Sequence, residues 1–527
     1  MYAIDNALQY AQGGILMHTK IFSATIVGVD AYIVEVEVDI SFGMVNFFIV
    51  GLPDAAIKES RQRVQTGLKN CGISLPDRKI TVNLAPADLK KEGTLFDLPI
   101  AIGILQASKL ILLQEDFLQE TIFLGELSLD GSIKPLKGAL AIAYDAKKLG
   151  KSRIILPKVN AQEAAFIKDL EVIGVDHLVE LIAFLKHETI ILPTQPLAIA
   201  KEKELHEHDF SQVKGQEVAK RALLIAAAGN HNILFIGSPG AGKTMLAKRL
   251  ATIMPDMDFE EILETSKIYS ISGKLHGKSL IHQRQFRGPH HTISQAGLVG
   301  GGSFPQPGEV SLAHHGILFL DELTEFKRAT LEALRQPIEN KEVSISRAQQ
   351  SLTFPAAFLL IAALNPCPCG FYGDKKRKCS CQPLQISRYL EKLSGPLLDR
   401  IDLQIYVPSI EFDALKDTKK TTSSAQMKVQ VDAVARIQKE RFSSSIKRNA
   451  TMNSDDVDAF CVLTDEAQVL IKKIFEQLHL SMRGYHKVLK VARTIADIDQ
   501  KEIIDVQHLQ EALSYRSLDQ YFERLKR

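Results

Sequence analysis

The chain has 527 residues, a length that at about 150 residues per domain predicts three or four domains. Apolar residues make up 45% and charged residues 24%, which excludes a disordered chain, a collagen-like fibre and a disulfide-stapled mini-protein. The 64 lysines and arginines nearly balance the 62 aspartates and glutamates, so any contact with nucleic acid must be local.

Neither a membrane span nor a signal peptide is predicted. No run reaches the roughly 18 apolar residues that a span needs, and the richest stretch, residues 223–236, is interrupted by polar residues. Residues 1–16 form a weak prefix without a basic start, after which Met17 opens a clearer pattern. Met17 is a candidate start of translation, and an ordinary N-terminal helix is the alternative. We expect a cytoplasmic protein.

Residues 17–185 alternate short strands and helices, which predicts an α/β or α+β domain. Residues 33–40 alternate apolar and polar side chains, as is typical of a strand. Strands are expected over residues 21–29, 33–40, 46–50, 80–84, 121–124 and 153–156. Helices are expected over residues 54–70, 99–108, 139–149 and 161–169.

Two segments of this domain resemble the Lon-type proteases. GELSLDGSIKPLKGALAIAY, from residue 125, is similar to the stretch with their catalytic lysine, and NLAPADLKKEGTLFDLPIAI, from residue 83, to the stretch with their serine. The serine position falls near Leu95 and the lysine position near Leu140, and neither side chain can supply the hydroxyl or amine of a Ser–Lys mechanism. The resemblance implies a Lon-protease-like (S5-type) fold without the dyad, reused for assembly or nucleic-acid contact.

A connector is predicted over residues 186–210, where two prolines precede a mixed charge run. His206 and His208 could bind a metal there, but we favour solvated linker histidines.

The strongest motif is a phosphate-binding loop. An apolar strand over residues 232–236 precedes GSPGAGKT and a helical stretch, the strand–loop–helix context that G-x-x-x-x-G-K-T requires. Backbone N–H groups would surround the phosphates of ATP, Lys243 would reach the β- and γ-phosphates, and Thr244 would bind Mg²⁺. The predicted nucleotide-binding residues are Gly237, Ser238, Pro239, Gly240, Ala241, Gly242, Lys243 and Thr244.

Two further apolar strands end in polar residues. Residues 317–320 lead into Asp321, which would hold Mg²⁺ through water, and Glu322, which would orient and deprotonate the attacking water. A strand within residues 355–366 ends at Asn365, which can position that water. The alternative, a strand ending in a solvated Asp-Glu pair, is disfavoured by the upstream phosphate-binding loop.

These motifs, followed by Arg400 and by two late helical arginines, resemble in their order the AAA+ ATPases. The resemblance implies that Asn365 is the sensor 1 residue, Arg400 the arginine finger and Arg483 the sensor 2 residue, with Arg493 as the alternative. A finger supplied to a neighbouring subunit implies a ring, which in this family usually closes at six.

Two insertions resemble those of magnesium chelatase ATPase subunits and MCM helicases: residues 286–316, and a hairpin with arms over 343–346 and 351–354. In those relatives the insertions point into the ring channel, which implies a basic channel that follows a phosphate backbone. The His290–His291 and His314–His315 pairs are interpreted as structural or interface histidines rather than metal ligands. The candidate DNA contacts are Lys274, Lys278, Arg284, Arg287, Lys341 and Arg347.

The Lon-like front end, FRGPHHT, GEVSLAHHG and NPCPCG together resemble the ComM/YifB magnesium chelatase-like family from Met17 to about Arg516. The resemblance implies a homohexameric ATPase that drives branch migration of recombination intermediates during natural transformation. The implied partners are single-stranded DNA, branched DNA and recombinase-coated intermediates, with no membrane. The alternatives are a magnesium-chelatase-type motor for metal insertion and a non-proteolytic remodelling factor.

Four of the six cysteines cluster in one loop rich in glycine and lysine. In a cytoplasmic protein four neighbouring thiolates predict tetrahedral Zn²⁺ rather than disulfides. Their spacing departs from C-x₂-C, so a reduced, metal-free loop is the alternative. The predicted zinc ligands are Cys367, Cys369, Cys379 and Cys381.

The chain is thus interpreted as α/β in three parts: the Lon-like domain, a central AAA+ core over residues 211–408 and a C-terminal helical lid. A polar connector is predicted over 409–428 and the lid over 429–527. The lid is expected to carry Arg483 onto the nucleotide. Its helices are expected over residues 429–442, 465–478, 483–497 and 506–515.

Overall fold

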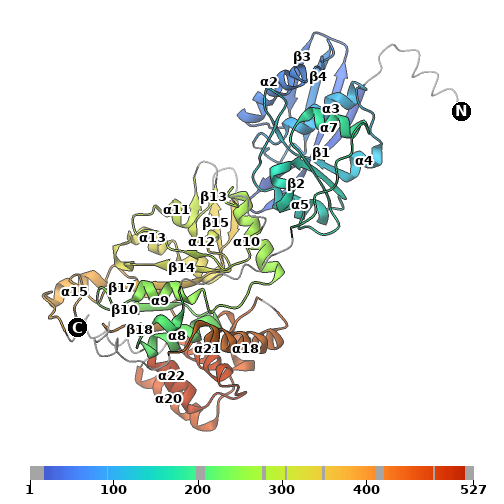
Figure 1. Ribbon diagram of the computed structural model, residues 1–527. Coiled ribbons are helices and arrows are strands. Elements are labelled where there is room, and N and C mark those ends of the chain that lie inside the picture. Colours follow the sequence, from blue (N-terminus) through green and yellow to red (C-terminus); the bar gives the residue numbers. More distant parts are fainter. Residues whose placement is uncertain are drawn as a thin grey trace. The chain divides into compact units, whose positions relative to one another are not determined.

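The computed structural model describes residues 17–91, 93–197, 208–275, 280–302, 305–346, 351–374, 376–409, 421–444, 446–478 and 481–516. Contacts divide the chain into two compact units (Figure 1). The N-terminal unit comprises Met1–Lys201 with Ser266–Ile281, and the C-terminal unit comprises Glu202–Thr265 with His282–Arg527. The prefix over residues 1–16 and residues 198–207 of the first connector lie outside the described residues.

The N-terminal unit is built on a seven-stranded mixed sheet. β1 pairs antiparallel with β2 and β2 with β4, and the remaining neighbours are parallel. The strands, in spatial order, are β3 (Asn46–Val50), β4 (Lys79–Ala85), β2 (Asp30–Ser41), β1 (Met17–Val27), β5 (Thr121–Phe123), β8 (Arg153–Pro157) and β9 (Glu171–Val175). A small hairpin joins β6 (Glu126–Leu127) to β7 (Ile133–Lys134).

The main core of this unit lies between the sheet and α2 (Ala55–Asn70), α3 (Asp97–Ala107) and α7 (Leu178–Leu185). Gly103 lets α3 approach β2 closely, because a Cβ there would lie 2.6 Å from Cγ2 of Val38. The other helices are α4 (Glu115–Glu120), α5 (Ala139–Lys148) and α6 (Lys158–Ala164).

The expected strands and most expected helices of this unit are confirmed. The helix expected over residues 161–169 is instead α6, which begins and ends earlier, and the short apolar elements β9 and α7 were missed. Leu140 is fully buried on α5 and Leu95 packs against the core, so both positions assigned to the missing dyad serve packing.

Ser266–Ile281 was expected in the ATPase core but belongs to the N-terminal unit. Lys267 Nζ lies 3.7 Å from a carboxylate oxygen of Asp145, and the hydroxyl of Ser270 donates to Glu163 at 2.6 Å. Burial raises the pKa of Glu163, while its hydrogen bonds to Ser270 and Asn160 oppose that shift. Lys267 and Ser270 lie far in sequence from their partners Asp145 and Glu163, so no local sequence pattern predicts these contacts.

The C-terminal unit contains a five-stranded, all-parallel sheet. Its strands, in spatial order, are β11 (Phe286–Arg287), β14 (Ile317–Leu320), β17 (Leu359–Leu364), β10 (Ile233–Ile236) and β18 (Leu403–Tyr406). The expected strands before the phosphate-binding loop, before Asp321 and before Asn365 are confirmed as β10, β14 and β17, and every residue of the three is buried. Parallel strands end at one edge, so the loops after them meet there.

Around this sheet lie α8 (Glu217–Gly229), α9 (Lys243–Leu250) and a series of short elements. The expected hairpin is confirmed as β15 (Glu342–Ser346) paired with β16 (Ser351–Pro355). The other elements are η1 (Phe210–Gln212), α10 (Phe259–Ile271, which belongs to the N-terminal unit from Ser266 on), α11 (Gln295–Val299), β12 (Gly300–Gly301), β13 (Gln306–Pro307), α12 (Glu309–Leu312), η2 (Leu323–Glu325), α13 (Arg328–Glu332), α14 (Arg335–Asn340), α15 (Pro383–Leu390) and α16 (Gly395–Leu398).

The C-terminal region is helical, as expected, and α18 and α21 pack against α8 (Figure 1). Its elements are α18 (Ser424–Phe442), η3 (Asn449–Thr451), α19 (Ser454–Phe460), α20 (Asp465–Leu478), α21 (Met482–Ile498) and α22 (Val506–Ser514). Among the helices that the structure describes, none has the length and apolarity needed to cross a membrane.

Candidate nucleotide site and metal centre

A pocket of about 410 Å³ lies at the edge of the parallel sheet where β10, β14 and β17 end. It brings together the phosphate-binding loop, the Asp-Glu pair and Asn365, as the sequence predicts. Its lining residues are Pro239, Gly240, Ala241, Gly242, Lys243, Thr244, Met245, Asp321, Glu322, Leu364 and Asn365.

The loop after β10 turns through two glycines in the left-handed region. Gly240 has φ +77° and Gly242 has φ +89°, backbone conformations that are strained for any residue with a side chain. The second of these glycines caps α9, whose first residue is Lys243. Unpaired N–H groups and the dipole of a helix start therefore face the pocket, which is a favourable environment for phosphate.

The ammonium of Lys243 already occupies a polar cage. Its Nζ donates to the carbonyls of Gly237 at 2.6 Å and Ser238 at 3.1 Å, and to Oδ1 of Asn365 at 3.0 Å. Burial lowers the pKa of Lys243, while the carboxylates of Asp321 and Glu322 oppose that shift. The cage fixes the amine beside Asn365, where it can reach a bound phosphate.

The oxygen donors in the pocket fit Mg²⁺. Oγ1 of Thr244 donates to Oδ2 of Asp321 at 2.6 Å, so a hydroxyl and a carboxylate already converge on one point. Mg²⁺ is bound through oxygen ligands such as these, together with waters and phosphates. Thr244 and Asp321 are thus the residues that would hold the ion.

Glu322, the candidate general base, has an unusual backbone. Its φ of +50° and ψ of +49° lie in the left-handed region, which side-chain-bearing residues occupy mainly at constrained and functional positions. Its carboxylate Oε2 lies 3.2 Å from Nδ1 of His291. His291, which the sequence analysis interprets as a structural or interface histidine, thus lies beside the candidate base.

Neither Arg400, the predicted finger, nor Arg483, the predicted sensor 2 residue, lines this pocket. The Arg400 guanidinium pairs with Glu339, and that of Arg483 lies 3.6 Å from the same carboxylate. The lid was expected to carry Arg483 onto the nucleotide, but in this structure Arg483 lies at Glu339 and does not line the pocket. The alternative, Arg493, is buried and pairs with Asp497 at 3.0 Å, which makes it structural.

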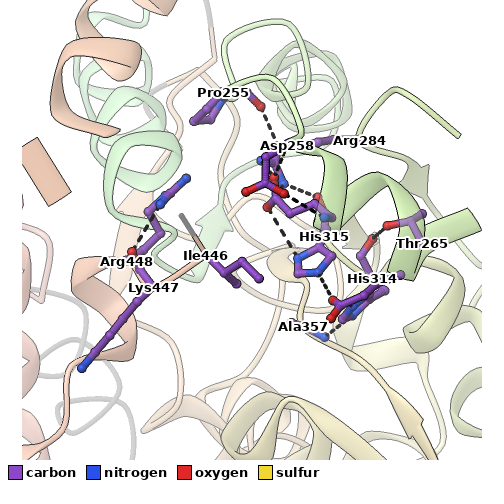
Figure 2. Close-up of polar contacts among 12 residues, drawn as sticks. Pro255, Asp258, Thr265, Arg284, His314, His315, Ala357, Ile446, Lys447 and Arg448 are labelled. Atoms are coloured by element: carbon purple, nitrogen blue, oxygen red, sulfur yellow. Dashed lines mark hydrogen bonds and ion pairs between the residues drawn. The ribbon is translucent and has the colours of Figure 1, made fainter. Parts of the chain in front are cut away.

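The DNA-contact prediction is wrong for Arg284 (Figure 2). Its guanidinium pairs with buried Glu261 at 2.8 Å and donates to the carbonyls of Pro255 and His315 at 2.7 Å each. Breaking a buried pair leaves an uncompensated charge, which costs several kcal/mol. Arg284 therefore braces the ATPase core.

The other basic candidates have mixed surroundings. Arg287 forms a bidentate pair with Glu309 at 2.6 and 2.7 Å. Lys341 is partly buried, and burial lowers its pKa while Asp402 opposes that shift. Lys274 is exposed but belongs to the N-terminal unit. Lys278 and Arg347 lie outside the described residues.

His314, His315 and Glu264 converge closely enough to raise the question of a metal (Figure 2). Nε2 of both histidines lies near Oε2 of Glu264, at 3.1 and 2.7 Å. However, Nδ1 of His314 accepts the N–H of Ala357 at 3.0 Å, so its proton must sit on Nε2 and cannot give way to a metal. The cluster thus fits a hydrogen-bonded structural pair.

The four clustered cysteines have the geometry of a metal centre. Their sulfurs lie within 4.8 Å of one another. Sγ of Cys367 lies 3.3 Å from that of Cys369 and 3.6 Å from that of Cys379. Tetrahedral Zn²⁺ with Zn–S bonds of about 2.3 Å separates its sulfurs by about 3.8 Å. The donor set therefore fits zinc despite its one-residue ligand spacing.

Family comparisons agree with this architecture. The profile described as "Magnesium chelatase, subunit ChlI" matches residues 209–415. Profiles described as "Subunit ChlI of Mg-chelatase" and "Magnesium chelatase, subunit ChlI C-terminal" match residues 36–160 and 421–516. The fold and the site define a magnesium chelatase-like AAA+ ATPase.

Full-length relatives narrow the assignment. The protein YifB of Escherichia coli is 43% identical over 514 residues, which cover 97% of this chain and 99% of that protein. The competence protein ComM of Haemophilus influenzae is 44% identical over 512 residues, or 96% and 98% of the two chains. The chain belongs to the ComM/YifB family.

The Lon resemblance has a narrower basis. The archaeal Lon protease of Methanothermobacter thermautotrophicus is 41% identical over 64 residues, which cover 12% of this chain and 10% of that protein. A common fold with the Lon protease domain, without its Ser–Lys dyad, remains our proposal for the N-terminal unit.

Proposed function

We propose that this chain is an ATP-driven ring motor that translocates DNA and promotes branch migration of recombination intermediates. The observation that supports the proposal is one pocket lined by the phosphate-binding loop, the Asp-Glu pair and Asn365, while Arg400 and Arg483 lie at Glu339. The resemblance to the competence protein ComM supports natural transformation as the setting, and general recombination repair would use the same motor.

In the proposed reaction each pocket residue has one task. Lys243 binds the β- and γ-phosphates, Glu322 accepts a proton from the attacking water, and Asn365 orients that water. When bound by Thr244 and Asp321, Mg²⁺ supplies charge neutralisation at the phosphates. Glu322 lines the pocket, where its carboxylate would meet the attacking water.

The described pocket has no arginine in its lining, which supports assembly into a ring. Phosphoryl transfer in this class needs an arginine at the developing charge, which contributes roughly 10³–10⁵ in rate. No arginine lines the described pocket, whereas Arg400 and Arg483 stand together at Glu339. We propose that both act on the pocket of a neighbouring copy, in a homohexamer.

DNA would pass along the ring axis, moved by the insertions. The β15–β16 hairpin follows α14 directly, and α14 ends beside Glu339, the partner of both arginines. A nucleotide-dependent shift of these arginines would therefore reach the hairpin. Single-stranded and branched DNA, including recombinase-coated intermediates, are the proposed partners.

The test is steady-state ATP hydrolysis without DNA, with single-stranded DNA and with a three-strand junction, using Glu322→Gln as the blank. We expect DNA to stimulate hydrolysis and junction resolution to require ATP. Equal rates in all three conditions, with no resolution of the junction, would overturn the proposal.

A second candidate is a motor for metal insertion into a tetrapyrrole, favoured by the three profile matches to chelatase subunits. It predicts hydrolysis that is indifferent to DNA but responds to porphyrin and Mg²⁺ in the presence of chelatase partner subunits. The same ATPase assay with those additions separates the two functions.

We also propose that Cys367, Cys369, Cys379 and Cys381 hold one structural Zn²⁺, which implies a reducing compartment such as the cytoplasm. The sulfur separations support this assignment. Thiol modification should release about one equivalent of zinc per chain, and release of less than about half an equivalent would reject it.

A further inference from the structure

The cysteine loop contacts the phosphate-binding loop directly. Oγ of Ser238, which is buried, donates to Oδ2 of Asp374 at 2.6 Å. Asp374 lies between the two cysteine pairs of the loop, outside the pocket lining. This hydrogen bond lowers the pKa of Asp374, so the acceptor is a carboxylate at neutral pH. Hydrogen bonds to charged acceptors are stronger than those between two neutral groups.

Asp374 is held in place by its own loop. Its second oxygen, Oδ1, accepts the backbone N–H of Lys376 at 2.7 Å and of Arg377 at 3.1 Å. The guanidinium of Arg377 lies over the ring of Phe371 at 5.1 Å, which adds a further internal contact. The carboxylate thus bridges the folded loop and the phosphate-binding loop.

A second contact lies at Gly370, which follows Cys369 directly. Gly370 has φ +83°, and a Cβ built on it would lie 2.5 Å from Cδ of Pro239. Only glycine therefore allows this close approach to the phosphate-binding loop. The cysteine loop begins just beyond Asn365, so it joins the end of β17 to the first residues of the nucleotide site.

We propose that the cysteine loop is a metal-dependent brace for the phosphate-binding loop, with Asp374 as the positioning residue that acts through Ser238. The inference rests on the proposed zinc site. Without a central ion, the segment between the cysteine pairs gains conformational freedom, and its ordering must then be repeated each time ATP binds. Metal loading would therefore set the affinity for ATP.

Two effects of the Asp374 carboxylate oppose each other. Its charge repels phosphate, but Asp374 lies outside the pocket lining, where the high dielectric constant of water weakens that repulsion. Its hydrogen bond to Ser238 fixes the loop, and loss of such a bond corresponds to about three- to tenfold in affinity. The hydrogen bond is expected to prevail, and two substitutions distinguish the effects.

The experiment measures zinc content, ATP dissociation constant and saturated turnover for the full chain and for Asp374→Ala and Asp374→Asn. Asp374→Ala should keep zinc and maximal turnover while binding ATP about three- to tenfold more weakly. Asp374→Asn keeps an acceptor for Ser238 and should stay within about twofold of wild type. Asp455→Ala, at an exposed aspartate of the same unit, is the matched control.

A second set of measurements changes the zinc content itself. Cys379→Ser should lose zinc and bind ATP about as weakly as Asp374→Ala, and combining the two should add little because both act through one contact. Reloading zinc into chelator-treated wild type should restore the affinity.

The outcomes separate the two proposals. Wild-type chain without zinc would refute the zinc site and, with it, the metal-dependent brace. Zinc at one equivalent together with unchanged or tighter ATP binding by Asp374→Ala would overturn the brace alone. Weaker binding together with lower saturated turnover, with zinc retained, would overturn it too, since Asp374 would then affect hydrolysis itself and not only the affinity for ATP.

Discussion

Arg400, in the turn after α16, and Arg483, on α21, share one carboxylate. Arg400 pairs with Oε2 of Glu339, and Arg483 lies 3.6 Å from Oε1. The hydrogen bond from Arg400 lowers the pKa of Glu339, and the charge of Arg483 acts in the same direction. Because α14 carries Glu339 and leads into β15, one side chain connects Arg400, α21 and the base of the hairpin.

Removing the finger should stop turnover in a way that a neighbour can repair. Arg400→Ala should lower ATP hydrolysis at least about 10³-fold because its charge acts at the adjacent subunit's pocket. Mixtures with Lys243→Ala should recover some activity, since some interfaces then pair an intact finger with an intact pocket. Arg388→Ala, at an exposed arginine of α15, serves as control. No recovery in mixed rings would contradict action in trans.

Lys243→Ala should abolish ATP binding. The substitution removes an ammonium already held at the phosphate position by two carbonyls and Asn365. We expect affinity to fall at least about 100-fold, which equilibrium titration with a fluorescent ATP analogue measures. Lys248→Ala, on the exposed side of the same helix, should bind normally. Wild-type affinity for Lys243→Ala would refute the phosphate assignment.

Glu322→Gln should bind ATP and fail to hydrolyse it. The amide keeps the shape of the side chain but cannot accept the proton of the attacking water, so turnover should fall by about 10²–10⁴. Rapid-quench measurement of bound nucleotide should show ATP that persists uncleaved. Glu325→Gln, three positions along and partly exposed, is the matched control. Normal hydrolysis by Glu322→Gln would exclude its role as base.

Acid should destabilise the C-terminal unit through His314. Burial lowers its pKa to about 4, against about 6.5 for an unfolded histidine. Between these values the unfolded chain binds more protons, so the stabilisation is complete above about pH 6.5 and is lost as pH falls toward 4. The loss from pH 7 to pH 5 should be about 2 kcal/mol.

Urea unfolding at pH 7 and pH 5 checks this expectation. His314→Asn keeps an acceptor for the N–H of Ala357 but does not titrate, so its stability should depend less on pH. Hydrogen bonds from His314 and His315 hold the pKa of Glu264 well below its ordinary range, so its carboxylate stays charged over this interval. An equal pH dependence for variant and wild type would exclude His314 as the titrating group.

Much of the fold could be predicted because the sequence patterns that specify it span only a few neighbouring residues. A run such as ILFI before a glycine-rich loop identifies a buried strand and a phosphate site by composition and spacing alone. The same holds for the hairpin arms and for α20, whose residues 465–478 were expected as observed. The short elements β9 and α7 were missed because brief apolar runs carry too little periodicity.

The candidate site also has one part that the sequence predicts and one part that it does not. The pocket residues could be predicted because the edge of a parallel sheet gathers the ends of its strands, wherever those strands occur in the chain. The role of Arg284 could not be predicted. The sequence around a basic residue in such an insertion is the same whether that residue contacts DNA or pairs with a carboxylate such as that of Glu261.

The sequence by itself predicted a nucleotide site at Lys243, Thr244, Asp321, Glu322 and Asn365, because these residue types at that spacing are typical of a phosphate-binding ATPase, and the structure gathers all five in one pocket. Only the tertiary structure decided which charges are neutralised and which segments act together. Glu339 with its two arginines, Asp374 on Ser238 and Ser266–Ile281 within the N-terminal unit all depend on long-range packing. Burial and ion pairing are properties of neighbours in space, and a linear pattern does not specify those neighbours.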